Sequence, residues 1–64
     1  MEISKKIINL RKENNLTKKQ MAKIIDICPK TLEKFENGES LPKLKHIRNI
    51  AHYFNVSYDY LLDE

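Results

Sequence analysis

Two predicted helices in the first half of the chain are joined by only three or four residues, and this short connection limits the folds open to the chain. The first helix spans about residues 18–25 and the second starts at Pro29. A connection this short cannot lay two helices antiparallel and side by side, so we expect them to cross at roughly 90–120°. Ala22 is small enough to let the two helices approach closely.

Local signals support both ends of this helix pair. Thr17 is a good N-cap, and Gln20 three residues later completes a capping box. Pro29 is favoured at the first position of a helix, which leaves Cys28 in the N-cap position. Asp26 tolerates the left-handed backbone needed between the helices, and Asn37–Gly38 suits the end of the second one.

Apolar residues recur at helical spacing in two further segments, about residues 2–13 and 43–54. Ser57 is expected to cap a last short helix, 58–62, with Asp59 in its first turn. Asn14–Asn15 and Asn55 end the first two of these segments. The residues expected to face the core of these segments and of the helix pair are Ile3, Ile7, Leu10, Met21, Ala22, Ile25, Leu32, Phe35, Leu44, Ile47, Ile50, Ala51 and Phe54. The sequence predicts an all-α fold of five short helices in a single domain, residues 1–64.

Composition excludes several classes of protein. A chain of 64 residues has little material for a walled cleft, so an enzyme is not expected. The single cysteine, Cys28, excludes an intramolecular disulfide and a multi-thiolate zinc site. His46 and His52 are six residues apart and cannot clamp zinc from one helical face, so we expect both at the surface and expect no metal or cofactor.

Neither a membrane span nor a secretion signal is expected. No apolar run approaches the roughly 20 residues that cross a membrane. The N-terminus has no signal-peptide core or cleavage site. These observations predict a cytoplasmic protein without a membrane partner.

Positive charge is concentrated in the first half of the chain. Residues 1–35 hold nine Lys or Arg and four Asp or Glu, a balance of +5, whereas residues 36–64 have a balance of −2. Segregated positive charge favours a nucleic-acid partner. Lysines that only keep the helices soluble are the alternative, and charge alone does not separate the two.

The order of these motifs resembles the Cro/repressor-type (XRE) helix-turn-helix family over nearly the whole chain. The segments that carry the resemblance are Leu16-Thr17, Met21-Ala22, Ile25, Asp26-Ile27, Thr31-Leu32, Phe35-Glu36-Asn37-Gly38, Pro42-x-Leu44, Ile50-Ala51 and Asn55-Val56-Ser57 through Leu61-Leu62. The resemblance implies a repressor-like DNA-binding fold with its helix-turn-helix in the second and third helices. It also implies a transcriptional regulator, most simply a repressor, that binds double-stranded DNA at a pseudo-palindromic operator as a homodimer.

In this arrangement the third helix lies in the major groove. At 100° per residue, its side chains opposite Leu32 and Phe35 form the outer face. Of these, the candidates for reading bases are Pro29, Lys30 and Glu33. Lys30 can donate to guanine, and Glu33 can accept from cytosine N4. The candidates for phosphate contacts are Thr17, Lys18, Lys19, Lys34, Asn37 and Lys43, the last by its position in the family.

A solvated helix face is the alternative interpretation of these side chains. Lys30 and Lys34 form a like-charge pair at i, i+4, which is mildly unfavourable without a counter-anion. This pair favours a polyanionic partner.

Three residues depart from the family pattern. Asp26 stands where the family usually has Gly, Cys28 where it has Ser or Thr, and Pro29 where it often has a base-reading polar residue. These departures put the identity of the base contacts in doubt and leave a second hypothesis open, a protein-interaction module such as an antitoxin or antirepressor. Cys28 either fills the cap position or acts as a redox-sensitive thiol.

The resemblance also implies a structural ion pair and a dimer surface. Arg11 and Glu36 would tie the first helix to the third. Tyr58, Tyr60 and Leu62 are not all needed for the small core, and tyrosine is common at interfaces. We expect these three residues to contribute to a two-fold dimer.

Overall fold

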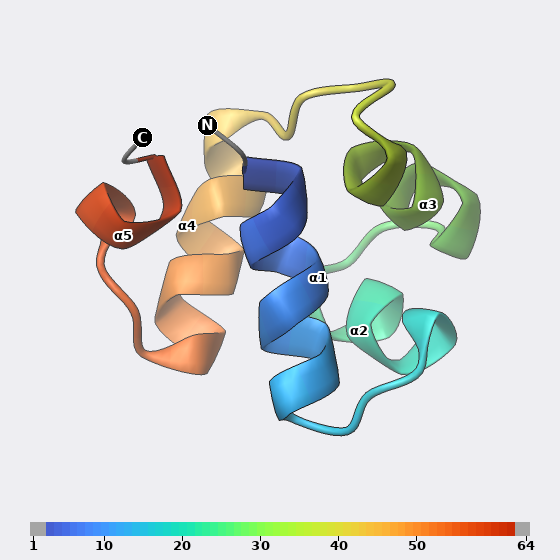
Figure 1. The fold of residues 1–64 in the computed structure, drawn as a ribbon, viewed down its shortest axis with the longest axis horizontal. Coiled ribbons are helices and arrows are strands. Elements are labelled where there is room, and N and C mark those ends of the chain that lie inside the picture. Colours follow the sequence, from blue (N-terminus) through green and yellow to red (C-terminus); the bar gives the residue numbers. More distant parts are fainter. Residues whose placement is uncertain (1–2, 63–64) are drawn as a thin grey trace.

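The computed structural model describes residues 3–62 and contains five helices (Figure 1). They are α1 (Ile3–Glu13), α2 (Lys18–Ile24), α3 (Pro29–Asn37), α4 (Leu44–Phe54) and α5 (Tyr58–Leu62). No strand occurs among these residues, which confirms the predicted all-α class. The predicted start of the first helix at Glu2 lies outside the described residues. Helix α1 occupies the middle, with α2 and α3 on one side of it and α4 and α5 on the other (Figure 1).

The first four helices end in the same way. Each is followed by a residue in the left-handed region, namely Asn15 (φ 56°), Asp26 (φ 62°), Gly38 (φ 78°) and Asn55 (φ 56°). The N–H of the next residue then donates to a carbonyl five residues back, as Ile27 does to Ala22 at 2.9 Å. This is the Schellman arrangement, which satisfies carbonyls that a helix end leaves unpaired. The predicted helix ends at these four positions are confirmed.

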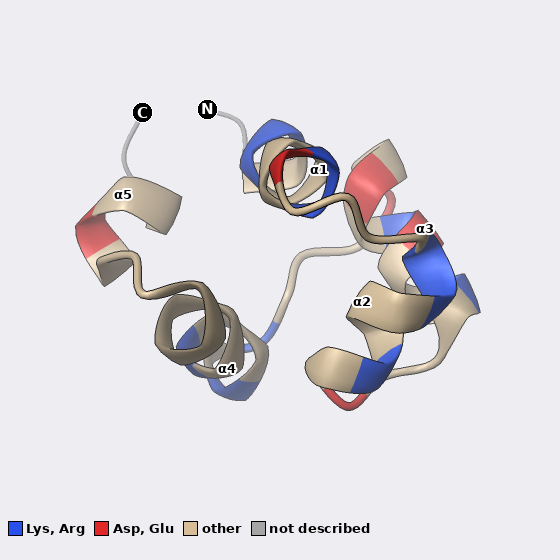
Figure 2. Cartoon of the chain, turned by 90° about the horizontal axis from the view of Figure 1, so that it is seen from below, with Lys and Arg blue, Asp and Glu red and all other residues tan. Residues whose placement is uncertain are grey.

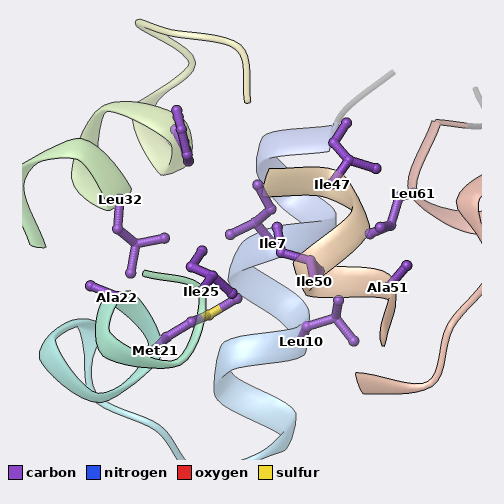
Figure 3. Close-up of a cluster of buried hydrophobic side chains, with 11 residues drawn as sticks. Ile7, Leu10, Met21, Ala22, Ile25, Leu32, Ile47, Ile50, Ala51 and Leu61 are labelled. Carbon is purple, nitrogen blue, oxygen red and sulfur yellow. The ribbon is translucent and has the colours of Figure 1, made fainter. Parts of the chain in front are cut away.

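The hydrophobic core draws on all five helices (Figure 3). Its fully buried large side chains are Ile7, Met21, Ile25, Leu32, Ile50 and Leu61. The residues that follow three of the left-handed positions, Leu16, Ile27 and Val56, pack against this core from outside. The chain reversals are therefore anchored by apolar contacts as well as by backbone hydrogen bonds.

The fourth helix differs from its prediction at its first turn. It begins at Leu44, with Lys43 as the N-cap residue, and the Leu44 side chain is 69% exposed. Leu44 was expected in the core, and that expectation is wrong. Helical spacing fixes the direction of a side chain but not whether another element covers it, and the first turn of α4 is left uncovered at this position.

Helix α5 is short but attached at three points. The Ser57 hydroxyl accepts from the Tyr60 N–H at 2.9 Å, as expected of an N-cap, and Leu61 is fully buried. On α1, Lys6 donates to the Tyr60 carbonyl, and its ammonium lies 4.8 Å from the centre of the Tyr60 ring. Among residues 3–62, no helix has the length and apolar character needed to cross a membrane.

Candidate nucleic-acid interface

The start of α2 is held by the predicted capping box. Thr17 Oγ1 accepts from the Gln20 N–H at 3.1 Å, and the Thr17 N–H donates to Gln20 Oε1 at 2.8 Å. The side chains of Lys18 and Lys19 follow directly and are exposed. Since the first N–H groups of a helix have no partner within it, this end carries partial positive charge beside two ammonium groups.

The turn between α2 and α3 brings the two helices into close contact at Ala22, which is 1% exposed. Asp26 takes the left-handed conformation that Gly usually supplies in the family, and its own N–H donates to the Lys23 carbonyl at 3.3 Å. Helix α3 then begins at Pro29, with Cys28 as its N-cap residue. The Cys28 side chain makes no cap hydrogen bond and is exposed.

Helix α3 separates its side chains cleanly into two faces. Leu32 and Phe35 are buried beneath it, as predicted. The outer face consists of five exposed side chains: Pro29, Lys30, Glu33, Lys34 and Asn37. All but Pro29 line one shallow hollow of about 400 Å³, together with Glu39. The predicted base-reading and phosphate candidates of α3 therefore share one accessible surface.

Two further hollows are lined jointly by residues at α3 and by residues of neighbouring segments. Lys19 and Pro29 line a hollow of about 540 Å³ between α2 and the start of α3. Lys43 lines another, of about 360 Å³, with Thr31 of α3. Both hollows include Cys28, the residue before α3, so Lys19 and Lys43 each line a hollow at the start of that helix. Lys18 is exposed at the start of α2 but lines none of these hollows. The Thr17 hydroxyl accepts in the cap, which leaves its O–H as a donor.

The charge of this region is predominantly positive. Between residues 18 and 43, six exposed lysines face three exposed carboxylates, while the fourth carboxylate, Glu36, is buried. Figure 2 shows the basic segments on α1 to α4, whereas α5 carries only an acidic one. The uneven charge distribution of the sequence therefore corresponds to an uneven distribution over the folded surface.

A partly buried ion pair fixes α3 to α1. Arg11 Nε lies 2.7 Å from Glu36 Oε2, and Arg11 Nη2 donates to Glu36 Oε1 at 3.2 Å. Arg11 Nη1 donates to the Leu16 carbonyl at 3.1 Å. The Arg11 guanidinium thus links α1 to α3 and also to the turn that precedes α2. The ion pair that the family resemblance implied is present.

Sequence reasoning missed the role of His46. It was expected at the surface together with His52; His52 is exposed, but His46 is partly buried, and its Nδ1 accepts from the Lys43 N–H at 3.3 Å. Burial lowers the pKa of His46 below its usual 6.5, and the neighbouring Lys45 and Lys43 lower it further. Its position three residues after the N-cap was the available signal. Within residues 3–62, no group of three side chains suited to a metal ion occurs.

Known proteins are similar to this chain in sequence and in fold. The phage transcriptional repressor RstR of Vibrio cholerae is 38% identical over 61 residues, which are 95% of this chain and 54% of that protein. The antitoxin PezA of Streptococcus pneumoniae is 41% identical over 56 residues, 88% of this chain and 35% of that protein. The chain thus spans about half or less of the length of these relatives.

The fold matches that of a phage repressor. The P22 c2 repressor, solved in complex with a synthetic operator, superposes with a TM-score of 0.90 over 98% of this chain and 96% of that one, at 19% identity. At this identity the likeness concerns the fold. The helix-turn-helix domain family matches residues 4–64, almost the entire sequence. The chain therefore belongs to the helix-turn-helix domain family, as its resemblance to Cro/repressor-type proteins predicted.

Proposed function

We propose that the chain is a transcriptional regulator that binds double-stranded DNA sequence-specifically, with α3 in the major groove. The observation that carries this proposal is the division of α3 into a buried apolar face and an exposed face of Lys30, Glu33, Lys34 and Asn37. An α-helix fits the major groove of B-DNA, where each base pair presents its own pattern of donors and acceptors. Such a regulator would act where the DNA is, in the cytoplasm.

Side chains near the start of α3 would read the bases. Lys30 offers three donors to guanine O6 and N7, and Glu33 accepts from cytosine N4. Pro29 has no donor, but its ring is exposed and suits the methyl group of thymine. We expect Lys30 and Glu33 to determine most of the specificity of the first half of the reading face.

Phosphate contacts would surround this reading face. Lys18 and Lys19 at the start of α2 suit one stretch of the DNA backbone, and Lys43 suits another. Lys34 and Asn37, further along α3, complete the set, while the Thr17 side chain would act through the cap. Because each ammonium that neutralises a phosphate releases counterions, the affinity should fall steeply with salt concentration.

Repression by a dimer is the finer part of the proposal. Tyr58, Tyr60 and Leu62 are 45%, 39% and 52% exposed on α5, which suits a surface that pairs with a second copy. A two-fold dimer would present two α3 helices to half-sites about 34 Å apart. The similarity to RstR, a repressor, supports this sign of regulation.

A second candidate function is a module that binds a partner protein, as an antitoxin does. The 41% identity to PezA favours it. The two candidates differ in their affinity for random duplex DNA at low salt. A DNA-binding regulator binds such a duplex weakly and without specificity, whereas a module dedicated to a protein partner leaves it free.

The deciding experiment is the selection of bound duplexes from a random DNA library, followed by titration of an enriched duplex. We expect a pseudo-palindrome to be enriched, Lys30→Ala to relax preference at one base pair, and Lys34→Ala to weaken all duplexes alike. Lys12→Ala, an exposed lysine on α1, is the matched control and should bind as the unmodified chain does. Failure to enrich any sequence would contradict the proposal.

Dimerisation is tested separately by sedimentation at high micromolar concentration, with and without the enriched duplex. Leu62→Glu places a charge on the α5 surface without touching the core, because Leu62 is half-exposed. We expect it to yield a monomer that binds DNA more weakly. A monomeric unmodified chain under both conditions would refute the dimer.

A further inference from the structure

The imidazole of His46 closes the first turn of α4. The backbone N–H of the N-cap residue Lys43 donates to His46 Nδ1 of the ring. The backbone N–H of His46 donates in turn to the Lys43 carbonyl at 2.9 Å. Gln20 makes the corresponding side-chain contact to Thr17 at the start of α2. A lysine side chain has no acceptor, so the box at α4 is one-sided and depends on the histidine alone. Glutamate or glutamine normally occupies this third position.

The same ring faces the candidate reading helix. The ring centres of His46 and Phe35 lie 5.5 Å apart with the planes tilted by 53°. Phe35 is 4% exposed and anchors α3 in the core. His46 also lines the hollow of about 360 Å³ that contains Lys43 and Thr31. One side chain therefore contacts both α3 and the residue that would bind the DNA backbone beside it.

The hydrogen bond from the Lys43 N–H depends on the charge of His46, because Nδ1 accepts a hydrogen bond only when it carries no proton. Burial lowers the pKa of His46, Lys45 and Lys43 of its own helix lower it further, and Asp26 from the turn before α3 raises it. The other residues that line the hollow with His46 and Lys43 are Cys28, which is titratable, and the uncharged Ile27, Thr31, Phe35, Ser40 and Leu41. At neutral pH the accepting form is the dominant one.

We propose that His46 is a positioning residue for DNA binding, whose neutral imidazole holds Lys43 and the start of α4 beside α3 in the orientation that meets the DNA backbone. This inference rests on the proposed DNA binding. Protonation of His46 removes the acceptor for the Lys43 N–H. It also adds a third cation beside Lys43 and Lys45, so the start of α4 is held less firmly.

The test compares the unmodified chain with His46→Gln and His46→Ala. Glutamine keeps an acceptor and does not titrate, whereas alanine removes the acceptor at every pH. Affinity for the duplex enriched by selection is measured at pH 7.5 and 5.5 at constant salt, with circular dichroism to verify the fold of each variant. His52 is common to all three proteins, so any contribution from it cancels in the ratios of their affinities.

We expect His46→Gln to match the unmodified chain at pH 7.5. At pH 5.5 the unmodified chain should bind more weakly than His46→Gln, by at most about fivefold, the usual effect of one helix cap. His46→Ala should bind about fivefold more weakly than His46→Gln at both pH values. Overlapping pH profiles of the unmodified chain and His46→Gln would overturn the inference.

A Lys43→Ala background tests whether His46 acts through Lys43. If it does, His46→Ala has no further effect on affinity in the Lys43→Ala background. The single variants His46→Ala and Lys43→Ala should each make the negative slope of log affinity against log salt shallower by about one. An undiminished effect of His46→Ala in this background would overturn the positioning role. Failure of the unmodified chain to bind any duplex would refute the proposed function and the inference with it, whereas binding with overlapping profiles refutes the inference alone.

Discussion

Removal of the Arg11 guanidinium should destabilise the fold far more than removal of a neighbouring surface charge. The Glu36 side chain is 4% exposed and that of Arg11 13%, so Arg11→Ala leaves a buried carboxylate without its partner. Breaking a buried pair in this way costs about 3 kcal/mol, and the lost bond to the Leu16 carbonyl adds roughly 1 kcal/mol. The total is a large part of the roughly 3–10 kcal/mol expected for a chain of this size.

Urea unfolding followed by circular dichroism measures this effect. With an m-value of about 1 kcal/mol/M, the loss of about 4 kcal/mol should lower the urea midpoint of Arg11→Ala by about 4 M. Lys12→Ala, which is exposed, should shift it by less than about 0.5 M. The double variant Arg11→Met/Glu36→Leu should recover most of the loss, because neither charge then needs to be desolvated. Equal midpoints for Arg11→Ala and Lys12→Ala would refute the reasoning.

Three further predictions concern stability. Asp26→Gly should raise the free energy of unfolding by about 0.5–1 kcal/mol, because glycine adopts φ 62° without strain. Gly38→Ala should lower it by about 1 kcal/mol, because alanine is strained at the positive φ of that position. Urea melts that show the opposite signs would contradict this. Cys28→Ser should stabilise the chain by about 0.5–1 kcal/mol by adding the missing cap bond to α3, and an unchanged melting temperature would exclude that bond. Since the pKa of His46 is lower in the folded chain than its usual 6.5, the unfolded chain binds the proton more readily. The contribution of neutral His46 to stability is therefore fully present above pH 6.5, and the free energy of unfolding should decline as the pH falls below 6.5. An equal decline in His46→Gln would assign the effect to another group.

Helix ends were predictable from the sequence because they depend on single residues. Asn15, Asp26, Gly38 and Asn55 each tolerate a left-handed backbone, and each marks the end of a helix. The capping box of Thr17 needed only a spacing of three residues. Such local preferences act before any tertiary contact forms, so they can be read without the fold.

Tertiary coverage was not predictable in the same way. Leu44 has the helical spacing of a core residue, yet its side chain is 69% exposed. His46 is a polar residue of the kind expected at the surface, yet the approach of α3 brings Phe35 against its ring. The outer face of α3 could be predicted because it is the complement of a buried face, whereas the residues beside it that come from α4 depend on how the chain returns through the loop.

The central position of α1 has a mechanical consequence. This helix is bonded to α3 through Arg11 and to α5 through Lys6, five residues apart and therefore about 7.5 Å apart along its axis. A continuous helix over this length offers no hinge, so α1 would act as a rigid spacer between the proposed reading helix α3 and the α5 surface. In a dimer built on α5, one extra base pair between half-sites would move the second site by about 3.4 Å and turn it by roughly 36°. The DNA, rather than the protein, would have to bend or twist to absorb that change.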